Sequence, residues 1–463
     1  MMDKQAIFEK WINRKDEEFK KETKESARLF AKAQENLPGG NTRTVTYFSP
    51  YPLYMAKGKG CKLYDVDGNE YIDFLNQYTA LIHGHCHPAI VEAVNEEANK
   101  GLSFAAPTEK EAILGRMICE RIKSVEQVRF CNSGTEATLF AIRAARLNSG
   151  KSRIVKIEGA YHGSHDLAEV SVLPVLKEAG PNDRPVSVPE HRAVPKSILD
   201  EVIAVPFNNK EATEKIIREH QKEIACVIME VMVAISGCIP AEDGYLDFVR
   251  DLTRELGIIL IYDEIVTFRL GQGGGQGIYD IQPDLTTFGK VIGGGLPVGA
   301  FGGSRELMKV FSPLEEGSVT HSGTFNANPM TLAAGIACLK ELTPAAMERI
   351  NSLGELIRQG INSILEKNGV VGMAIGLGSL AHVHFNKERV RDYRTYAQGN
   401  FQAITLLHRE LLERGINIAP RGGEIAISTP MTEKEIKMFL TAFEESLIEI
   451  KPFIKQTTPE LII

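Results

Sequence analysis

Short apolar runs alternate with amphipathic stretches between residues 108 and 303. The runs are almost continuously hydrophobic, as in strands that are buried on both faces, and the stretches between them have the spacing of helices. Strands are expected within 125–134, 152–159, 225–233, 258–264 and 285–303, and helices within 109–122, 135–150 and 245–257. This alternation predicts an α/β fold with a largely parallel sheet covered on both faces and with ligands at the carboxyl ends of its strands.

The two ends of the chain follow other patterns. Residues 3–36 predict one or two amphipathic helices that need a partner surface, either the body of the protein or a second subunit. Residues 53–75 alternate apolar and polar positions around Asp67-Gly68-Asn69, so they predict a small antiparallel sheet with a hairpin turn. We expect three regions: an N-terminal arm and small sheet (1–85), a large domain (86–330) and a smaller α+β domain (331–463).

Composition and charge narrow the class of protein. The 463 residues are 43% hydrophobic and 24% charged, as in a globular protein of two or three domains. The net charge of −7 comes without any basic block, so no nucleic-acid partner is expected. We also expect no secretory leader and no membrane span, because no apolar run is long enough. Seven scattered cysteines without CxxC spacing predict reduced, buried thiols in a cytoplasmic protein.

Two segments carry a further expectation. Residues 168–200 are rich in proline and charge and predict an excursion on the surface. The histidines of HGHCHP (83–88) raise the alternative of a metal site, but carboxylate or thiol partners at useful spacing are lacking. Pro88 instead predicts the first turn of a helix, so we expect no metal.

The chemistry is concentrated in residues 255–299. An apolar run, Ile258–Ile261, leads to Asp263 and Glu264, and after a glycine-rich loop Lys290 stands just before three glycines. A pyridoxal phosphate (PLP) enzyme needs a lysine that forms the Schiff base with the cofactor and a carboxylate that pairs with the ring nitrogen. Lys290 and Asp263 are our candidates for these roles. The alternatives are a structural salt bridge for Asp263 and a phosphate-loop lysine, for which the motif GxxxxGK[ST] is absent.

A second motif, Ser133-Gly134-Thr135, is expected between a strand and a helix. Small residues there let hydroxyls and backbone N–H groups approach a phosphate at the start of the helix. The alternative is a plain helix cap. The presence of Lys290 and Asp263 favours the phosphate site.

Two more candidates lie at the same predicted edge of the sheet. Tyr161 and His162 follow the strand within 152–159, where an aromatic ring can stack on a flat cofactor; the alternative is a tyrosine packed under a loop. Glu230 ends the strand within 225–233 and is a candidate to orient a water or the phenolic edge of the cofactor.

The motifs NSGTEA, EGAYHG, IYDEI, PDLTTFGKVIGGGLPVGAFGG and HSGTFNANP together resemble the class III (subgroup II) aminotransferases of PLP fold type I. The resemblance runs from about residue 35 to the C-terminus. It implies a large domain with a mostly parallel seven-stranded sheet and a smaller α+β domain built from the N-terminal arm and the C-terminus. It also implies PLP as cofactor and a homodimer with shared active sites.

Site residues carry over from the family by motif. Lys290 matches the Schiff-base lysine, and Asp263 matches the partner of the ring nitrogen. The other implied cofactor contacts are the phosphate-binding Ser133, Gly134 and Thr135, the stacking Tyr161, the opposite-face Ile265, and Thr324, which matches a threonine that reaches the neighbouring subunit's cofactor.

Within this class the chain looks like the glutamate-1-semialdehyde 2,1-aminomutase branch, which includes β-amino-acid (β-phenylalanine-type) aminotransferases. Aminomutases typically have PGGVNSPVRAF and EPVAGN, whereas this chain has PGGNTRTVTYF and EVMVAISG. NQYTA, HSGT and APRG resemble the β-amino-acid pattern more closely, in which two arginines matching Arg43 and Arg421 bind substrate carboxylates. Without the resemblance, each arginine is more simply a surface ion pair. Tyr78 and His321 are further candidates for pocket walls.

The sequence thus predicts a PLP-dependent transaminase that moves an amino group from a β-amino acid to a 2-oxo acid such as 2-oxoglutarate or pyruvate. One alternative is the aminomutase, an isomerase that gives 5-aminolevulinate. The other is a PLP-binding protein without catalytic activity.

Overall fold

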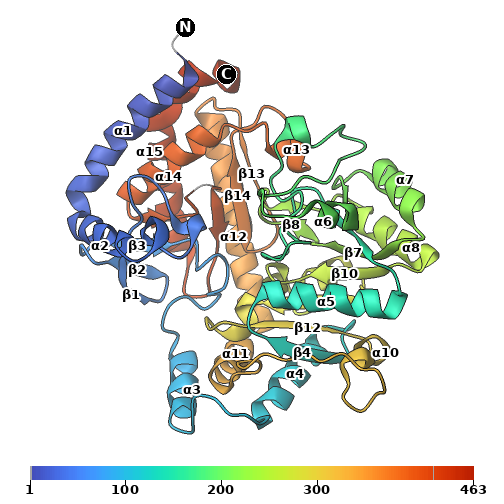
Figure 1. Ribbon diagram of the computed structural model, residues 1–463. Helices are drawn as coiled ribbons and strands as arrows, with labels where there is room; N and C mark the ends of the chain where they lie inside the picture. Colours follow the sequence, from blue (N-terminus) through green and yellow to red (C-terminus); the bar gives the residue numbers. More distant parts are fainter. Residues whose placement is uncertain (1–2, 421) are drawn as a thin grey trace.

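A seven-stranded sheet forms the centre of the computed structural model, which describes residues 3–420 and 422–463 (Figure 1). Its strands, in spatial order, are β4 (Gln127–Cys131), β12 (Gly299–Gly303), β11 (Leu285–Gly289), β10 (Ile259–Asp263), β7 (Ile224–Met229), β5 (Arg153–Ile157) and β6 (Val202–Val205). Only β12 runs antiparallel to its neighbours. The predicted α/β fold with a mostly parallel seven-stranded sheet is confirmed, although β6 was not expected.

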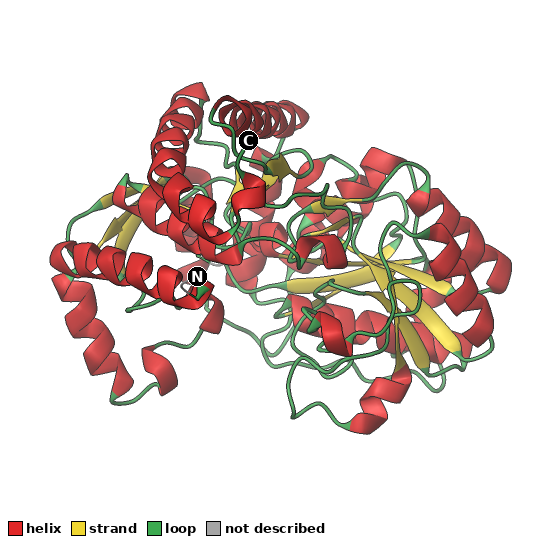
Figure 2. Ribbon diagram, turned by 90° about the horizontal axis from the view of Figure 1, so that it is seen from above, coloured by secondary structure: helices red, strands yellow, loops and turns green. Residues whose placement is uncertain are grey.

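Helices cover both faces of this sheet because its strands are apolar on both sides (Figure 2). In β10, Ile261 packs into the core beneath α5 (Gly134–Ser149), whereas Leu260 and Tyr262 pack into the opposite core beneath α7 (Lys210–His220) and α8 (Tyr245–Leu256). The alternation of side chains along β10 therefore places them in two separate cores, one on each face of the sheet. The covering helix α7 was not expected from the sequence.

The other elements of the middle of the chain surround this sheet. The helices are α3 (Pro88–Ala98), α4 (Glu109–Arg121), α6 (Lys196–Glu201), α9 (Gly274–Tyr279), α10 (Arg305–Met308) and α11 (Pro329–Glu341), with a two-stranded ribbon of β8 (Met232–Val233) and β9 (Ile239–Pro240). Pro88 is the first residue of α3, as predicted, and Gly150 follows α5 in the left-handed conformation.

The N-terminal arm packs on the body of the same chain. Its helix α1 (Lys4–Glu22) lies beside the C-terminal helices α14 (Phe401–Glu413) and α15 (Glu433–Thr457), and α2 (Lys24–Gln34) follows it near the first strands in Figure 1. The buried Lys15 ammonium forms an ion pair of 2.7 Å with Glu410. The C-terminal part also contains the long α12 (Pro344–Lys367) and the short α13 (Tyr393–Tyr396).

Two small sheets flank the main one. The predicted antiparallel strands are β1 (Met55–Lys59), β2 (Lys62–Asp65) and β3 (Glu70–Asp73), and β15 (Ile416–Asn417) joins them in parallel to β3. The second sheet consists of β13 (Met373–Ile375), β14 (Leu380–His384) and β16 (Glu424–Ala426). The domain boundaries at residues 85 and 330 stay a prediction.

Most of residues 168–200 are exposed or half-buried, as expected of a surface excursion, but several of their side chains are buried against the body of the protein. Val170 and Ala179 have no exposed surface. The reason lies far along the chain: Arg394 in α13 makes two hydrogen bonds to Glu158, of 2.8 and 2.9 Å, and donates to the carbonyl of Gly180 at 2.7 Å. This guanidinium fastens the segment onto the body.

The remaining expectations from composition concern thiols, metals and membranes. All seven cysteines are free, but Cys86 is exposed and Cys119 half-buried, so the expectation of buried thiols holds for the other five. Among residues 3–420 and 422–463, no cluster of histidine, cysteine, aspartate and glutamate is suited to a metal ion. Within the same residues, no helix has the length and apolar character to cross a membrane.

Candidate active site

Lys290 follows the last residue of β11 and begins a short 3-10 turn, Lys290–Gly293. Its backbone is in the left-handed region, with φ of 50°, so the side chain leaves the sheet at a sharp bend. Burial lowers the pKa of the Lys290 amine, and the carboxylates of Glu424, Glu230 and Asp263 oppose this shift. The amine therefore lies in an environment that favours its neutral form.

Asp263 is the last residue of β10 and is 3% exposed. Its Oδ1 accepts hydrogen bonds from Thr287 Oγ1 at 3.0 Å and from the backbone N–H of Ile265 at 3.1 Å. Its Oδ2 lies 2.8 Å from Nδ1 of His162. Burial lowers the pKa of His162, so the neutral ring donates from Nδ1 and fixes the carboxylate. Nε2 of His162 is buried and has no partner among the described residues.

The start of α5 lies beside this carboxylate. Ser133 caps the helix, because its Oγ accepts from the N–H of Glu136 at 3.1 Å, so the simpler helix-cap interpretation is realised in the structure. The same helix start presents the N–H groups of Gly134 and Thr135, which a helix leaves without intrahelical partners. A Cβ on Gly134 would come within 2.6 Å of Ile265 Cδ1, which shows how closely the two segments approach.

Two further predicted residues lie at the ends of β5 and β7. Tyr161 is 43% exposed, and its hydroxyl lies 3.1 Å from Ser164 Oγ. Glu230 follows β7 and is buried; its Oε1 accepts from the N–H of Ala234 at 3.3 Å, and its Oε2 has no partner among the described residues. Burial and the neighbouring charge of Asp263 raise the pKa of Glu230 well above its ordinary value.

These side chains meet at one edge of the sheet because the strands that carry them are parallel. β4, β5, β7, β10 and β11 all end at this edge. The edge offers a helix start suited to a phosphate, a buried carboxylate suited to a protonated ring nitrogen, and a lysine in a setting that favours the neutral amine. The residues present therefore fit PLP.

The structure also brings together two of the predicted substrate residues. The guanidinium carbon of Arg43 lies 5.1 Å from the centre of the Tyr78 ring, and the Tyr78 hydroxyl donates to the carbonyl of Val45 at 2.7 Å. Stacking on the ring orients the guanidinium without neutralising it. Arg421, the second predicted arginine, lies outside the described residues.

His321 and Thr324 lie in another environment. His321 packs on the rings of Phe140, Phe301 and Phe311, and this burial lowers its pKa to about 4. Thr324 is exposed. None of the contacts described for residues 3–420 and 422–463 joins either residue to Lys290.

Two charged residues near the site were missed by sequence reasoning. Glu424 in β16 is the carboxylate with the largest influence on the charge of Lys290. Lys156 has no exposed surface, and its ammonium donates to the carbonyls of Ala160, Ala168 and Val170. A lysine in the middle of the apolar run RIVKIEG was a signal for such a role, whereas nothing local distinguished Glu424.

The fold and the site define a PLP-dependent enzyme of fold type I. The sequence matches the family model for class-III aminotransferases over residues 46–447, and the chain belongs to this family. Enzymes of this class use PLP, so the expected cofactor is confirmed, and so is the expectation of an enzyme.

Among sequence relatives, the glutamate-1-semialdehyde 2,1-aminomutase of Methanothermobacter thermautotrophicus is 40% identical over 428 residues, covering 92% of this chain and 99% of that protein. The corresponding protein of Methanocaldococcus jannaschii is 38% identical, covering 90% and 98%. Among solved structures, an ω-transaminase from Sphaerobacter thermophilus is 44% identical with a TM-score of 0.89, covering 92% and 98%. The β-phenylalanine aminotransferase from Variovorax paradoxus is 35% identical with a TM-score of 0.87, covering 96% and 98%.

Proposed function

We propose that this chain transfers the amino group of a β-amino acid with an apolar or aromatic side chain to a 2-oxo acid such as 2-oxoglutarate or pyruvate. The observation that carries the proposal is the pairing of Arg43 with Tyr78, 5.1 Å apart. It presents a fixed cation and an aromatic wall, which suit a carboxylate and an apolar substituent. The similarity to the β-phenylalanine aminotransferase named above supports the same substrate class, and the similarity to the ω-transaminase supports transamination.

Lys290 is the residue that moves the proton. When bound, PLP supplies an aldehyde that takes up the amino group and a ring that withdraws electrons from the carbon bearing it. The Lys290 amine, which burial favours in its neutral form, accepts a proton from that carbon and returns it after rearrangement. Lys290 therefore acts as general base and then as general acid.

Asp263 and its neighbours hold the ring. The carboxylate pairs with the protonated ring nitrogen, and His162 and Thr287 fix its orientation through bonds of 2.8 and 3.0 Å. Tyr161 and Ile265 would pack against the ring. Ser133, Gly134 and Thr135 would hold the phosphate at the start of α5, and Glu230, whose pKa is raised by burial and by Asp263, would face the phenolic edge.

A second subunit completes the site in this proposal. Thr324 is exposed, and its neighbour Phe325 is 60% exposed, as is expected of a segment that contacts another copy of the chain. The partner's Thr324 then reaches the phosphate. A molar mass of twice the chain in light scattering, and a loss of cofactor affinity in Thr324→Ala, are the expected results. A monomer with full activity would exclude the shared site.

The substrate is bound by the residues at the mouth of the site. Arg43 and Arg421 bind the carboxylates of the donor and of the acceptor, and Tyr78 lines the space around the substituent, whereas His321 packs on the rings of Phe140, Phe301 and Phe311. Substitution of each residue in turn tests its role separately.

The test is a panel of amine donors with one fixed 2-oxo acid. We expect the highest kcat/KM with β-phenylalanine-type donors and a rise of about tenfold or more in their KM in Arg43→Ala, as for the loss of a charged hydrogen bond. Arg14→Ala is the matched control, because Arg14 is also exposed in the arm and lies 5.0 Å from an aromatic ring, that of Trp11. Equal KM values in the two variants would refute the role of Arg43.

The second candidate is the aminomutase, which the sequence relatives favour. An aminomutase returns the amino group to the same carbon skeleton, so it needs no acceptor. Incubation with glutamate-1-semialdehyde alone separates the two: we expect little 5-aminolevulinate, and efficient formation without any amino acceptor would overturn the transaminase proposal.

A further inference from the structure

Four consecutive residues before Ala80 have left-handed backbones. The φ angles are 49° at Asn76, 55° at Gln77, 52° at Tyr78 and 72° at Thr79. Residues with a Cβ are unfavourable in this region, and consecutive ones are rare. Backbone hydrogen bonds from Thr79 to Leu75 and from Leu81 to Asn76 close the turn, and contacts from the surrounding structure must offset its strain.

One end of the turn is held by side chains of its own neighbourhood. Asp73 Oδ1 accepts from the N–H groups of Leu75 and Asn76, each at 3.1 Å. The Asn76 side chain, which has no exposed surface, donates from Nδ2 to the carbonyl of Ala426 at 2.7 Å. This end is therefore fixed to β3 and β16.

The other end of the turn is held by Arg269, which lies six residues after Asp263 in the chain. Its side chain has no exposed surface. Nη1 donates to the carbonyl of Thr79 at 3.1 Å, Nε donates to Ser379 Oγ at 3.1 Å, and Nη2 donates to the carbonyl of Ile427. Burial lowers the pKa of Arg269 to about 10, so the guanidinium remains charged at neutral pH.

The buried cation has no carboxylate among its hydrogen-bond partners in the described chain. A buried charge without an ion-pair partner is costly, so its retention at this point calls for a role. The three acceptors belong to three segments: the left-handed turn, the β13–β14 connection, and the end of β16. Arg269 thus ties the segment that follows Asp263 to all three.

The turn also lies next to both halves of the candidate site. A Cβ on Gly295, five residues after Lys290, would come within 2.8 Å of Leu81 Cδ2. On the other side of the turn, the Arg43 guanidinium stacks on the Tyr78 ring, and the Tyr78 hydroxyl donates to the carbonyl of Val45. A change in the turn would therefore move the substrate residues relative to Lys290.

We propose that Arg269 is a positioning residue for substrate recognition, which acts by holding the strained turn 76–79 and, through Tyr78, the guanidinium of Arg43. This inference rests on the proposed role of Arg43 and Tyr78 in binding the donor. It assigns Arg269 no contact with substrate or cofactor.

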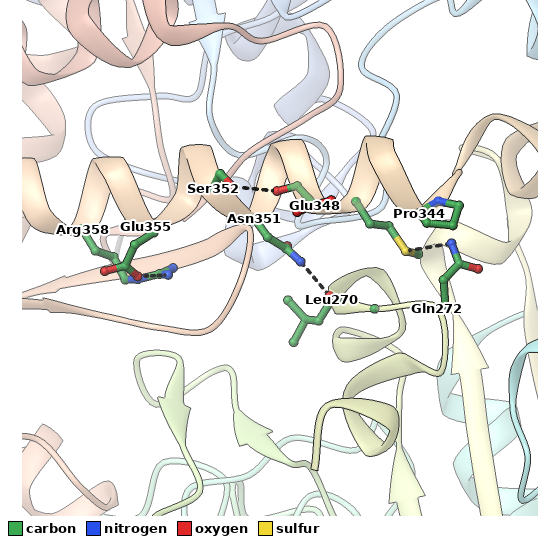
Figure 3. Close-up of a pocket in the computed structure, with 10 residues that line it drawn as sticks. Leu270, Gln272, Pro344, Glu348, Asn351, Ser352, Glu355 and Arg358 are labelled. Atoms are coloured by element: carbon green, nitrogen blue, oxygen red, sulfur yellow. Dashed lines mark hydrogen bonds and ion pairs between the residues drawn. The ribbon is translucent and has the colours of Figure 1, made fainter. Parts of the chain in front are cut away.

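The test compares Arg269→Lys with Arg358→Lys. A lysine has one nitrogen and cannot reach Ser379, Thr79 and Ile427 together. Arg358 in α12 is the matched control: it is buried and donates to the carbonyls of Gly378 and Leu380, on either side of Ser379, but not to the turn. Figure 3 shows Arg358 beside Glu355 on this helix, and Asn351 reaching Leu270, the neighbour of Arg269.

We expect Arg269→Lys to raise the KM for the β-amino acid about tenfold, as for one lost hydrogen bond to a charged group, with kcat within about threefold and the visible absorption of the bound cofactor unchanged. Both variants should have a lower melting temperature than the wild type, but Arg358→Lys should leave KM unchanged. Equal KM values in the two variants, or a loss of kcat and absorption in Arg269→Lys, would overturn the proposal.

A second variant tests the strain itself. Gln77 is exposed, and glycine adopts its φ of 55° without penalty, so Gln77→Gly should bring the raised KM of Arg269→Lys part of the way back to the wild-type value. The same substitution should leave the KM of Arg358→Lys unchanged. If Arg269→Lys does not fold, Asn76→Ser releases the other end of the turn, and an unchanged KM there refutes the proposal.

Tyr78→Ala separates failure of this inference from failure of the proposed function. If Tyr78→Ala leaves KM unchanged, the substrate role of Tyr78 is wrong. If Tyr78→Ala raises KM and Arg269→Lys does not, only the role of Arg269 is wrong. If both raise KM, the double variant should show less than the sum of the two effects, because both act through one residue.

Discussion

Replacing Asp263 with asparagine removes the charge at the end of β10 and keeps the shape of the side chain. The carboxylate is 3% exposed and accepts from Thr287, Ile265 and His162. Asparagine has one acceptor oxygen, so it can keep the first two bonds and loses the bond from His162 Nδ1. One such loss lowers the free energy of unfolding by about 1–3 kcal/mol.

The loss of activity should be larger than the loss of stability. A protonated ring nitrogen that faces a neutral amide is a buried charge without its partner, and such a loss costs about 3–5 kcal/mol. Since each 1.4 kcal/mol is about tenfold, kcat/KM should fall by at least a hundredfold. Steady-state kinetics, the visible absorption of the bound cofactor and the melting temperature are measured on the same preparations.

Asp284→Asn is the matched control. Asp284 Oδ2 accepts from the N–H of Leu260 at 2.8 Å and from Arg250 Nη1 at 2.9 Å, at the opposite end of β10. This variant should lose stability and keep its activity. If Asp263→Asn keeps more than about a third of the wild-type kcat/KM, or if both variants lose activity equally, the pairing of Asp263 with the ring nitrogen is wrong.

Three further predictions concern stability and cofactor affinity. Burial lowers the pKa of His408 to about 3, so the fold loses stability as pH falls from about 6.5, by up to about 1.4 kcal/mol per pH unit. His408→Leu should therefore make the free energy of unfolding in urea less sensitive to pH between about 4 and 6.5. An unchanged dependence of that free energy on pH would contradict this. Gly134→Val places a Cβ 2.6 Å from Ile265 Cδ1 and should weaken cofactor binding about tenfold in a fluorescence titration, whereas unchanged binding would exclude close packing there. Glu264→Ala leaves two N–H groups of α9 unpaired and should lower the free energy of unfolding by about 3 kcal/mol in denaturant titration; a loss below about 1 kcal/mol would argue against it.

The sequence predicted the elements whose hydrophobic pattern is local. The apolar run of β10, the periodic α5 and the glycine after it are each visible within a short window, and their alternation was enough for a parallel sheet. The strand β6 was missed because it follows a segment rich in proline and charge. That segment is anchored to the body by Arg394, about two hundred residues later, and no local pattern contains such a contact.

Candidate site residues were predictable where they end a strand. Asp263, Glu230 and Lys290 follow apolar runs, and a parallel sheet brings the ends of such runs together. Arg269 was not recognised because its burial depends on segments from both ends of the chain, and Glu424 was not recognised because no apolar run leads to it. The bond from His162 to Asp263 joins residues about a hundred positions apart and was likewise not predictable.

The most direct test of the proposed chemistry is to reduce the holoenzyme with borohydride and to map the labelled peptide by mass spectrometry. Lys290 should carry the pyridoxyl group, and Lys290→Ala should carry none and should not turn over a β-amino acid. A pyridoxyl group on another lysine, or a labelled and active Lys290→Ala variant, would contradict the assignment of Lys290 as the residue that binds the cofactor and moves the proton.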